Sequence, residues 1–362
     1  MNTAERVVTA MNHEEPDRVP IWTMIDNAEV LRKYAADTEH NDCEYDALVR
    51  GEDRPEQLLW LIKRAATALG IDVIFFGGGY PFNPFPREFE EVRSDAKWDT
   101  DFHSVSDIKA FIPEIPDYEE IAGSYVARMR QATKILAPEV VAVDQQESCL
   151  ELAWSTIGLQ TFSMALYDEP GEILRILDAA ADACRVHAQV YADYHISFAY
   201  QISGDIAYKG RTMFSPDFLR REYFPRLARQ LEPIKQAGIK VVYHSDGDVT
   251  NVIDGLIEVG VDALNPIEPT AGMDLALIKK RYGKNLVLIG NVDPNAMSIG
   301  TPREVEQDVK RCIRDGAKGG GLFIDSGAGE LMPWFSLRNI EAMCHAVHRY
   351  GRYPVQAAVD RD

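Results

Sequence analysis

Short apolar runs rich in β-branched and aromatic residues alternate with longer amphipathic stretches along this chain of 362 residues. Most of these runs lack a strict alternation of apolar and polar positions, as expected for parallel strands buried on both faces of a sheet. Eight runs predict strands, at residues 18–26, 72–77, 140–145, 198–205, 240–246, 263–268, 286–293 and 321–326. The pattern therefore predicts an α/β fold with a parallel sheet.

The amphipathic stretches of the second half have the length of helices and carry helix boundary signals. Ser215-Pro216 and Thr301-Pro302 each place a capping residue before a proline, which favours a helix start at that point. The predicted helices cover residues 216–238, 250–260, 273–283, 301–316 and 336–351. Eight strands with intervening helices predict a (β/α)8 TIM barrel. An open doubly wound sheet is the alternative, because counting strands does not reveal whether the sheet closes.

Two segments exceed a minimal barrel. Residues 27–70 predict two N-terminal helices before the second strand. Residues 80–118 are rich in proline and aromatic residues, and we expect them to form a β-ribbon insertion over the barrel mouth. Neither segment has the composition of a linker, so we expect a single domain over residues 1–362.

The composition excludes some classes of protein and partner. A hydrophobic content of 46% is too high for a disordered chain. With 38 Lys+Arg against 57 Asp+Glu, the net charge of −19 would repel nucleic acid and anionic membranes. The five scattered cysteines form no CxxC pair, and no apolar run approaches the roughly 18 residues of a membrane span. We expect a cytoplasmic protein, with a homodimer left open.

Acidic residues end seven of the eight predicted strands. They are Asp26, Asp144 with Glu147, Asp205, Asp246, Glu268, Asp293 and Asp325. The functional site of a TIM barrel lies at the carboxyl ends of its strands, so these groups are expected to converge on one mouth. Acids gathered in this way raise one another's pKa values unless a cation or hydrogen-bond donors intervene. The alternative is that each caps the helix that follows.

His244-Ser245-Asp246 is the sharpest local signal among these strand ends. Residues two apart in a strand point to the same face, so His244 and Asp246 can act together. An imidazole beside a carboxylate is either half of a metal site or an acid–base pair. With Asp205, these two are the candidate catalytic residues. The candidate substrate-binding residues nearby are Asp26, Phe76, Gly78, Gln146, Asn291, Asp293 and Ser326.

Several longer motifs resemble the uroporphyrinogen decarboxylase superfamily. They are DRVPIW from residue 17, YHSDGDVTNVIDGLIEVGVDALNPIEPTAGMDLALIKKRYG from residue 243, LIGNVDP, GGGLFIDSG and YGRYP. Their order agrees with that superfamily over almost the whole chain, from about residue 4 to residue 354. The resemblance implies a (β/α)8 barrel, in agreement with the strand count. It also implies one of two chemistries, a haem-pathway decarboxylation or a corrinoid-dependent methyl transfer.

The residues argue against the decarboxylase of the haem pathway. In those enzymes an arginine-bearing stretch after the first strand grips the carboxylates of the substrate, whereas residues 22–29 contain no arginine and two acids here. The aspartate that those enzymes carry after the second strand is also missing from the segment Phe75-Phe76-Gly77-Gly78-Gly79. A polycarboxylate would not be drawn to an acidic mouth without cationic groups to bind it.

The other branch comprises methyltransferases whose zinc is held by a His-x-Cys motif and a later cysteine. His244 matches the histidine, whereas Asp246 and Ala328 stand where the cysteines are expected. The resemblance therefore implies an oxygen-rich site of His244, Asp246 and either Glu268 or Asp205, suited to zinc or another divalent metal ion. It predicts demethylation of a small O- or N-methylated compound, with the methyl group passed to a corrinoid on a separate protein.

Two other functions stay open at this point. One is a metal-independent lyase or decarboxylase acting on a small carboxylic acid, with His244 as general acid and Asp246 orienting it. The other is a non-catalytic binding protein that lacks the zinc thiolates of its relatives.

Overall fold

A computed structural model describes residues 1–35, 55–76 and 102–355 of the chain. All eight predicted strands are present, and each pairs in parallel with its neighbours in the order β1-β2-β3-β4-β7-β8-β9-β10. The strands are β1 (Trp22–Thr23), β2 (Val73–Phe76), β3 (Val141–Glu147), β4 (Ala199–Ser203), β7 (Lys240–His244), β8 (Ala263–Asn265), β9 (Val287–Ile289) and β10 (Leu322–Phe323).

The sheet closes into a barrel where its last strand meets its first. Ile21 and Ile324 form a parallel bridge just outside the named strands. The amide of Trp22 donates to the carbonyl of Ile324 at 3.0 Å, and the amide of Ile324 donates to the carbonyl of Pro20 at 2.9 Å. This closure confirms the predicted (β/α)8 barrel over an open doubly wound sheet.

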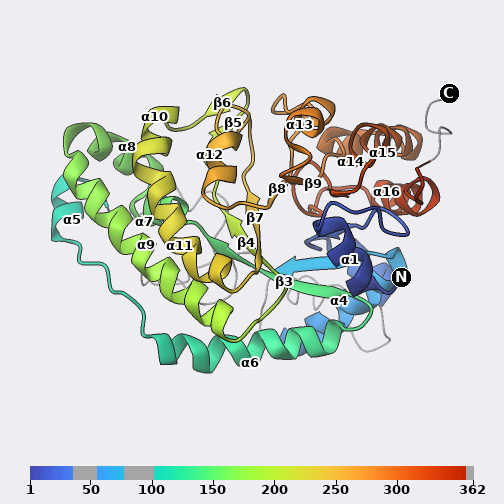
Figure 1. The fold of residues 1–362 in the computed structure, drawn as a ribbon, viewed down its shortest axis with the longest axis horizontal. Coiled ribbons are helices and arrows are strands. Elements are labelled where there is room, and N and C mark those ends of the chain that lie inside the picture. The colour runs from blue at the N-terminus through green and yellow to red at the C-terminus, as the bar shows by residue number, and fades with distance from the viewer. Residues whose placement is uncertain (36–54, 77–101, 356–362) are drawn as a thin grey trace.

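Helices surround the strands, with α8, α9 and α11 on one side of the molecule and α14, α15 and α16 on the other (Figure 1). The helices before β4 are α1 (Thr3–Met11), α2 (Ala28–Ala35), α4 (Pro55–Leu69), α5 (Val105–Ala110), α6 (Tyr118–Leu136), α7 (Cys149–Ile157), α8 (Leu159–Asp168) and α9 (Pro170–Asp193). Those after β4 are α10 (Pro216–Phe218), the π-helical stretch η2 (Leu219–Tyr223), α11 (Phe224–Gln236), α12 (Ile253–Glu258), α13 (Leu275–Tyr282), α14 (Pro294–Ile299), α15 (Pro302–Gly316) and α16 (Leu337–Tyr350).

Side chains alternate between two cores along each strand. The inner core fills the barrel and includes Trp22, Phe75, Val143, Val242 and Phe323. Residues one position away face the outer core between strands and helices. Residues of α1 join the inner core, so this helix closes the amino-terminal end of the barrel. Whether a strand residue can reach the barrel mouth therefore depends on which of these two directions its side chain takes.

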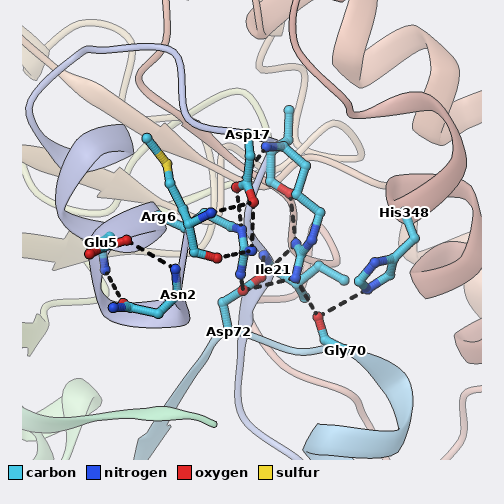
Figure 2. A network of polar contacts seen from close by, with 11 residues as sticks. Asn2, Glu5, Arg6, Asp17, Ile21, Gly70, Asp72 and His348 are labelled. Atoms are coloured by element: carbon cyan, nitrogen blue, oxygen red, sulfur yellow. Dashed lines mark hydrogen bonds and ion pairs between the residues drawn. The ribbon is translucent and has the colours of Figure 1, made fainter. Parts of the chain in front are cut away.

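A buried ion-pair network joins the first segment of the chain to β2 (Figure 2). The carboxylate of Asp72 accepts hydrogen bonds from the guanidinium groups of Arg6 and Arg18, at 2.8 to 2.9 Å, and from the amide of Ile21 at 2.9 Å. Arg6 also pairs with Asp17 near the surface. Nearby, Nε2 of His348 lies 3.1 Å from the carbonyl oxygen of Gly70. These contacts fix α1 and α16 against the first two strands.

The expected β-ribbon insertion is wrong for the part of it that the structure describes. Residues 102–118 hold the short helix α5 and the start of α6 rather than strands. The reason is a capping box, in which Ser104 accepts from the amide of Asp107 while the Asp107 carboxylate accepts from the amide of Ser104. The rest of the segment, residues 80–101, lies outside the described residues. Two short strands, β5 (Ala207–Tyr208) and β6 (Arg211–Thr212), form a hairpin elsewhere, after β4.

The two predicted N-terminal helices are present as α2 and α4. Across the described ranges, none of the helices combines the length and the apolar character needed to span a bilayer. Four of the five cysteines fall in these ranges, and Cys149, Cys184, Cys312 and Cys344 are all buried as free thiols.

Candidate functional site

Two neighbouring strands bring the central residues of the site together. His244 is the last residue of β7. Its side chain points into the barrel, as does that of Val242 two residues earlier in the inner core. Asp205 follows β4 and Asp246 follows β7, so both carboxylates lie in loops at the carboxyl end of the barrel. The two strands pair in register, with Ser203 opposite His244. Sequence positions about forty apart therefore meet at one point of the mouth.

Asp205, His244 and Asp246 form a compact cluster of donor atoms. Nε2 of His244 lies 4.0 Å from Oδ1 of Asp205 and 3.9 Å from Oδ1 of Asp246. One donor atom from each of the three residues lies within 4.8 Å of the other two. Oδ1 of Asp205 also accepts a 3.0 Å hydrogen bond from the amide of Asp246. The predicted catalytic residues are thus together in space.

Charges at the cluster shift the protonation of its members. Burial alone would lower the pKa of His244, but the carboxylates of Asp246 and Asp205 raise it, and the net shift is upward. Burial raises the pKa of Asp246 to about 7, with Asp205 and Glu268 adding to the rise and His244 opposing it. Near neutral pH the cluster therefore holds exchangeable protons.

Two further carboxyl groups lie at the same mouth. Burial raises the pKa of Asp26 to about 6. Burial also raises the pKa of Glu330 to about 7, where Asp26 and Asp246 add to the rise and His244 opposes it. Glu330 was not predicted from the sequence, although it follows the last strand in the loop 327–331, as a mouth residue should.

The other face of the His244 ring is closely packed. Nδ1 lies 2.7 Å from Oδ1 of Asn265, and a Cβ on Gly329 would come within 2.7 Å of Cε1 of the ring. Behind Asn265 lies Asp325, which is fully buried; burial raises its pKa to about 8, against hydrogen bonds from Thr23, Ser326 and Asn265. On this side, the His244 ring is hydrogen-bonded to the buried side chain of Asn265, which is itself hydrogen-bonded to the buried Asp325.

The donor set fits a divalent metal ion. An imidazole and two carboxylates are ligands that zinc and other divalent ions accept. Oδ1 of Asp246 is shielded from solvent and has no hydrogen-bond partner among the described residues, although the Asp246 side chain as a whole is half exposed. A shielded carboxylate oxygen without a partner is costly unless a proton or a cation satisfies it. Asp205, His244 and Asp246 would be the residues that hold such an ion.

A sequence model of the family described as uroporphyrinogen decarboxylase (URO-D) matches residues 66–350, most of the chain. The chain belongs to the URO-D family. This membership confirms the resemblance seen in the motifs, and it covers the strands that carry Asp205, His244 and Asp246. A shared fold does not fix the reaction, which depends on the residues of the site.

Relatives of known sequence or structure align with this URO-D family member over nearly its full length. It is 23% identical over 338 residues to the uroporphyrinogen decarboxylase of Shewanella pealeana, covering 90% of this chain and 91% of that protein. It is 25% identical over 379 residues to that of Alkalilimnicola ehrlichii, covering 98% and 96%. A solved methyltransferase from Methanosarcina mazei superposes with a TM-score of 0.70 at 17% identity, covering 97% and 99%. The structural likeness confirms the barrel fold.

The third residue of the donor cluster, beside His244 and Asp246, is Asp205 rather than Glu268 in this family member. Both carboxylate oxygens of Glu268 have other partners. Oε2 accepts a 2.7 Å hydrogen bond from the amide of Gly247, and Oε1 accepts one from the hydroxyl of Thr270. Glu268 therefore stabilises the turn after β7, and its negative charge raises the pKa of Asp246.

Asn291, Asp293 and Ser326, predicted to bind substrate, each make hydrogen bonds within the protein. The Asn291 amide donates to the carbonyl of Ile267, and its Oδ1 accepts from Arg311 at 2.8 Å. Asp293 caps α14 by accepting from the amide two residues on at 2.8 Å. The hydroxyl of Ser326 donates to the carbonyl of Glu330 at 2.7 Å and so shapes the loop that carries this acid.

The side chains of Phe76 and Asp144 point away from the mouth, toward the surrounding helices. Phe76 lies in the outer core, whereas its neighbour Phe75 lies in the inner one. Asp144 is fully buried, and its Oδ2 accepts a 2.7 Å hydrogen bond from the hydroxyl of Tyr125 on α6 and another from the amide of Gln146. The expected convergence of seven acids is therefore reduced, since Asp144 faces the helix layer. Gly78 lies outside the described residues.

Proposed function

We propose that this protein is a methyltransferase that takes a methyl group from a small O- or N-methylated compound and passes it to the corrinoid of a separate protein. Asp205, His244 and Asp246 would hold a divalent metal ion, with zinc as the first candidate. The observation that carries the proposal is their compact donor cluster, in which the shielded Oδ1 of Asp246 has no hydrogen-bond partner among the described residues. The likeness to a Methanosarcina mazei methyltransferase over nearly the whole chain supports the same reaction class.

The charges around the cluster also support this reaction over a haem-pathway decarboxylation. Among the described residues, the charged groups with the largest effect on the pKa values of His244, Asp246 and Glu330 are carboxylates and His244 itself. An acidic mouth repels a polycarboxylate, whereas it tolerates a neutral methyl ether and attracts a methylammonium ion. The site is therefore better suited to a small neutral or cationic methyl donor.

Each part of the site has a chemical task in this reaction. A divalent ion bound at the cluster would act as a Lewis acid toward the heteroatom that the methyl group leaves. A methylammonium ion already carries its proton and leaves as the neutral amine. With a methyl ether or a neutral methylamine, the electron pair of the broken carbon–heteroatom bond stays on the heteroatom, which then needs a proton. The carboxyl group of Glu330, whose pKa is raised to about 7, can supply that proton near neutral pH. Asp26 lies close enough to raise the pKa of Glu330 through its charge.

The reaction is tested by presenting the zinc-loaded protein with free cob(I)alamin under reducing conditions and a panel of small methyl ethers and methylamines. Methyl transfer converts cob(I)alamin to methylcobalamin, which is followed by its absorbance. We expect turnover with at least one donor, and its loss in His244→Ala. Asp217→Asn, which changes an exposed acid on α10, serves as the matched control and should retain activity.

Other outcomes would contradict this proposal. Turnover of a small carboxylic acid after exhaustive chelation, without cobalamin, would favour the lyase alternative with His244 as general acid. Ligand-induced thermal stabilisation without turnover of any donor in the panel would favour a binding protein.

A further inference from the structure

The ring of His244 has its second nitrogen bound within a buried chain of side chains. His244 and Asn265 are register partners on β7 and β8, and Nδ1 of His244 lies 2.7 Å from Oδ1 of Asn265. The amide nitrogen of Asn265 donates in turn to Oδ2 of Asp325 at 3.2 Å. Asn265 and Asp325 are both fully buried.

The contacts of Asp325 determine which way the Asn265 amide points. Once ionised, the Asp325 carboxylate only accepts at Oδ2, so the NH2 group of Asn265 then faces Asp325. The carboxyl group of Asp325 cannot turn freely, because its Oδ1 accepts a 2.7 Å hydrogen bond from the amide of Ser326. The carbonyl oxygen of Asn265 is consequently the atom presented to His244. A carbonyl oxygen only accepts hydrogen bonds, so Nδ1 of His244 must donate.

The neutral His244 side chain therefore has one favoured tautomer, with its proton on Nδ1. With its proton on Nδ1, the ring presents the lone pair of Nε2 to the mouth, 3.9 to 4.0 Å from the carboxylates of Asp246 and Asp205. The tautomer with its proton on Nε2 would direct that N–H toward these carboxylates. Its bare Nδ1 would then face Oδ1 of Asn265, and both of these atoms are acceptors. Outer groups that orient a histidine in this way also set its affinity for a metal ion.

We propose that Asn265 and Asp325 are positioning residues, which together hold the neutral His244 side chain with its proton on Nδ1 and its Nε2 lone pair directed at the carboxylates of Asp205 and Asp246. The metal-related consequence of this assignment rests on the proposed function, whereas the proton position does not.

The proton position is measured by NMR on the full-length protein labelled with 15N-histidine and stripped of metal by a chelator, at a pH above the titrations of both His244 and Asp325. The His244 signal is assigned by its absence in His244→Gln. We expect protonated Nδ1 and bare Nε2 in the wild type and in Asn265→Asp, which keeps an acceptor oxygen. Asn265→Leu removes that acceptor and should shift the proton toward Nε2. A wild-type proton on Nε2, or an unchanged Asn265→Leu, would overturn the proposal.

Asp325 is tested by a matched pair of variants in the same experiment. Asp325→Asn keeps an acceptor oxygen for the Asn265 amide and should preserve the Nδ1 proton. Asp325→Leu removes it, so Asn265 can turn over and the proton should move. The same proton position in both variants would remove Asp325 from the assignment. Thermal melting of every variant shows whether the barrel remains folded.

Zinc affinity, measured by competition with a chromogenic chelator, provides the second readout. Asn265→Leu should weaken binding roughly 10–100-fold, the usual effect of losing an outer group, while Asn265→Asp restores it. Equal affinities in the wild type and Asn265→Leu would overturn the link to the metal. If the wild type binds no zinc but carries its proton on Nδ1, the metal part of the proposed function fails and the positioning assignment stands.

Discussion

The backbone amide of Asp246 donates a 3.0 Å hydrogen bond to Oδ1 of Asp205, the same atom that lies 4.0 Å from Nε2 of His244. The bond joins the loops that follow two neighbouring strands, β4 and β7. The position of one donor atom is thus set by a main-chain group, which has less freedom than a surface side chain. This arrangement suits a site in which charge is already in place before a ligand arrives.

Asp205→Asn should keep the loop in place but weaken metal binding. The amide oxygen can still accept from the Asp246 backbone, whereas the anionic ligand is lost. Because removal of an outer group alone costs roughly 10–100-fold in metal affinity, we expect at least that loss for zinc, measured by chelator competition. His244→Ala should lose the metal altogether. Zinc occupancy equal to that of the wild type in His244→Ala would remove the metal site, and Asp217→Asn on the exposed face of α10 serves as control.

Zinc binding should strengthen as pH rises through about 7. The ligand atoms must be deprotonated, and burial raises the pKa of Asp246 to about 7 while the neighbouring carboxylates raise the pKa of His244. Below this range each displaced proton costs roughly tenfold in affinity per pH unit. Titrations at several pH values between about 5.5 and 8.5 measure the slope. A flat profile would show that other groups bind the ion.

Gly329→Ala should disturb His244 more than a matched glycine substitution does. The new Cβ would lie 2.7 Å from Cε1 of the ring and 3.1 Å from Nδ1, so the ring must move. Gly319 has the same φ of +79° but nothing within 4 Å of its added Cβ, so Gly319→Ala isolates the backbone strain. Both variants should lose roughly 1 kcal/mol of stability or more, but only Gly329→Ala should also lose zinc affinity. Equal zinc affinities in the two variants would contradict this expectation.

Asp144→Asn should stabilise the protein at alkaline pH. Burial raises the pKa of Asp144 from 3.8 to about 7, so its proton stabilises the fold at low pH, and this stabilisation is lost progressively as pH rises from about 4 to about 7. Ionisation in the folded state then costs on the order of 2–4 kcal/mol by pH 8. The amide imitates the neutral acid, so the melting temperature of the variant should exceed that of the wild type at pH 8 and match it near pH 4. Equal melting temperatures at pH 8 would argue against a buried charge.

Asp72→Ala should be among the most destabilising changes in the first part of the chain. It would leave the partly buried guanidinium groups of Arg6 and Arg18 without their shared carboxylate (Figure 2). Removing one partner of a buried pair costs roughly 3–5 kcal/mol, whereas Asp17→Ala removes a 40% exposed partner and should cost about 1 kcal/mol or less. Urea unfolding of both variants measures the difference, and similar costs would contradict it.

The sequence predicted the barrel well because buried parallel strands leave a clear pattern of apolar runs. The same property concealed side-chain direction. A strand that is apolar on both faces does not reveal which residues face inward, so Asp144 and Phe76 were assigned to the mouth while the structure places them toward the helices. The proximity of His244 and Asp246 was expected from the alternation of a strand, and the two are close in the structure, although Asp246 lies in the loop after β7 rather than in the strand.

Residues that act through others were the hardest to predict. Nothing in the sequence around Asn265 marks it as a site residue. It contacts His244 only because the register of β7 and β8 pairs the two residues, and the sequence does not show this register. Glu330 lies in a loop whose path no local pattern fixes. The helix α5, by contrast, carried a readable signal, because Ser104 and Asp107 have the spacing of a capping box.

The alternation of side chains along β7 has a consequence for how this chain can change in evolution. His244 faces the barrel interior, while Tyr243 before it belongs to the outer core. Insertion or deletion of a single residue within residues 240–244 would exchange these two environments, turning an imidazole toward the helices and a phenol toward the mouth. Strand β7 can therefore vary at positions other than His244 but not in its length, whereas a longer loop after a strand would not turn His244 to the other face.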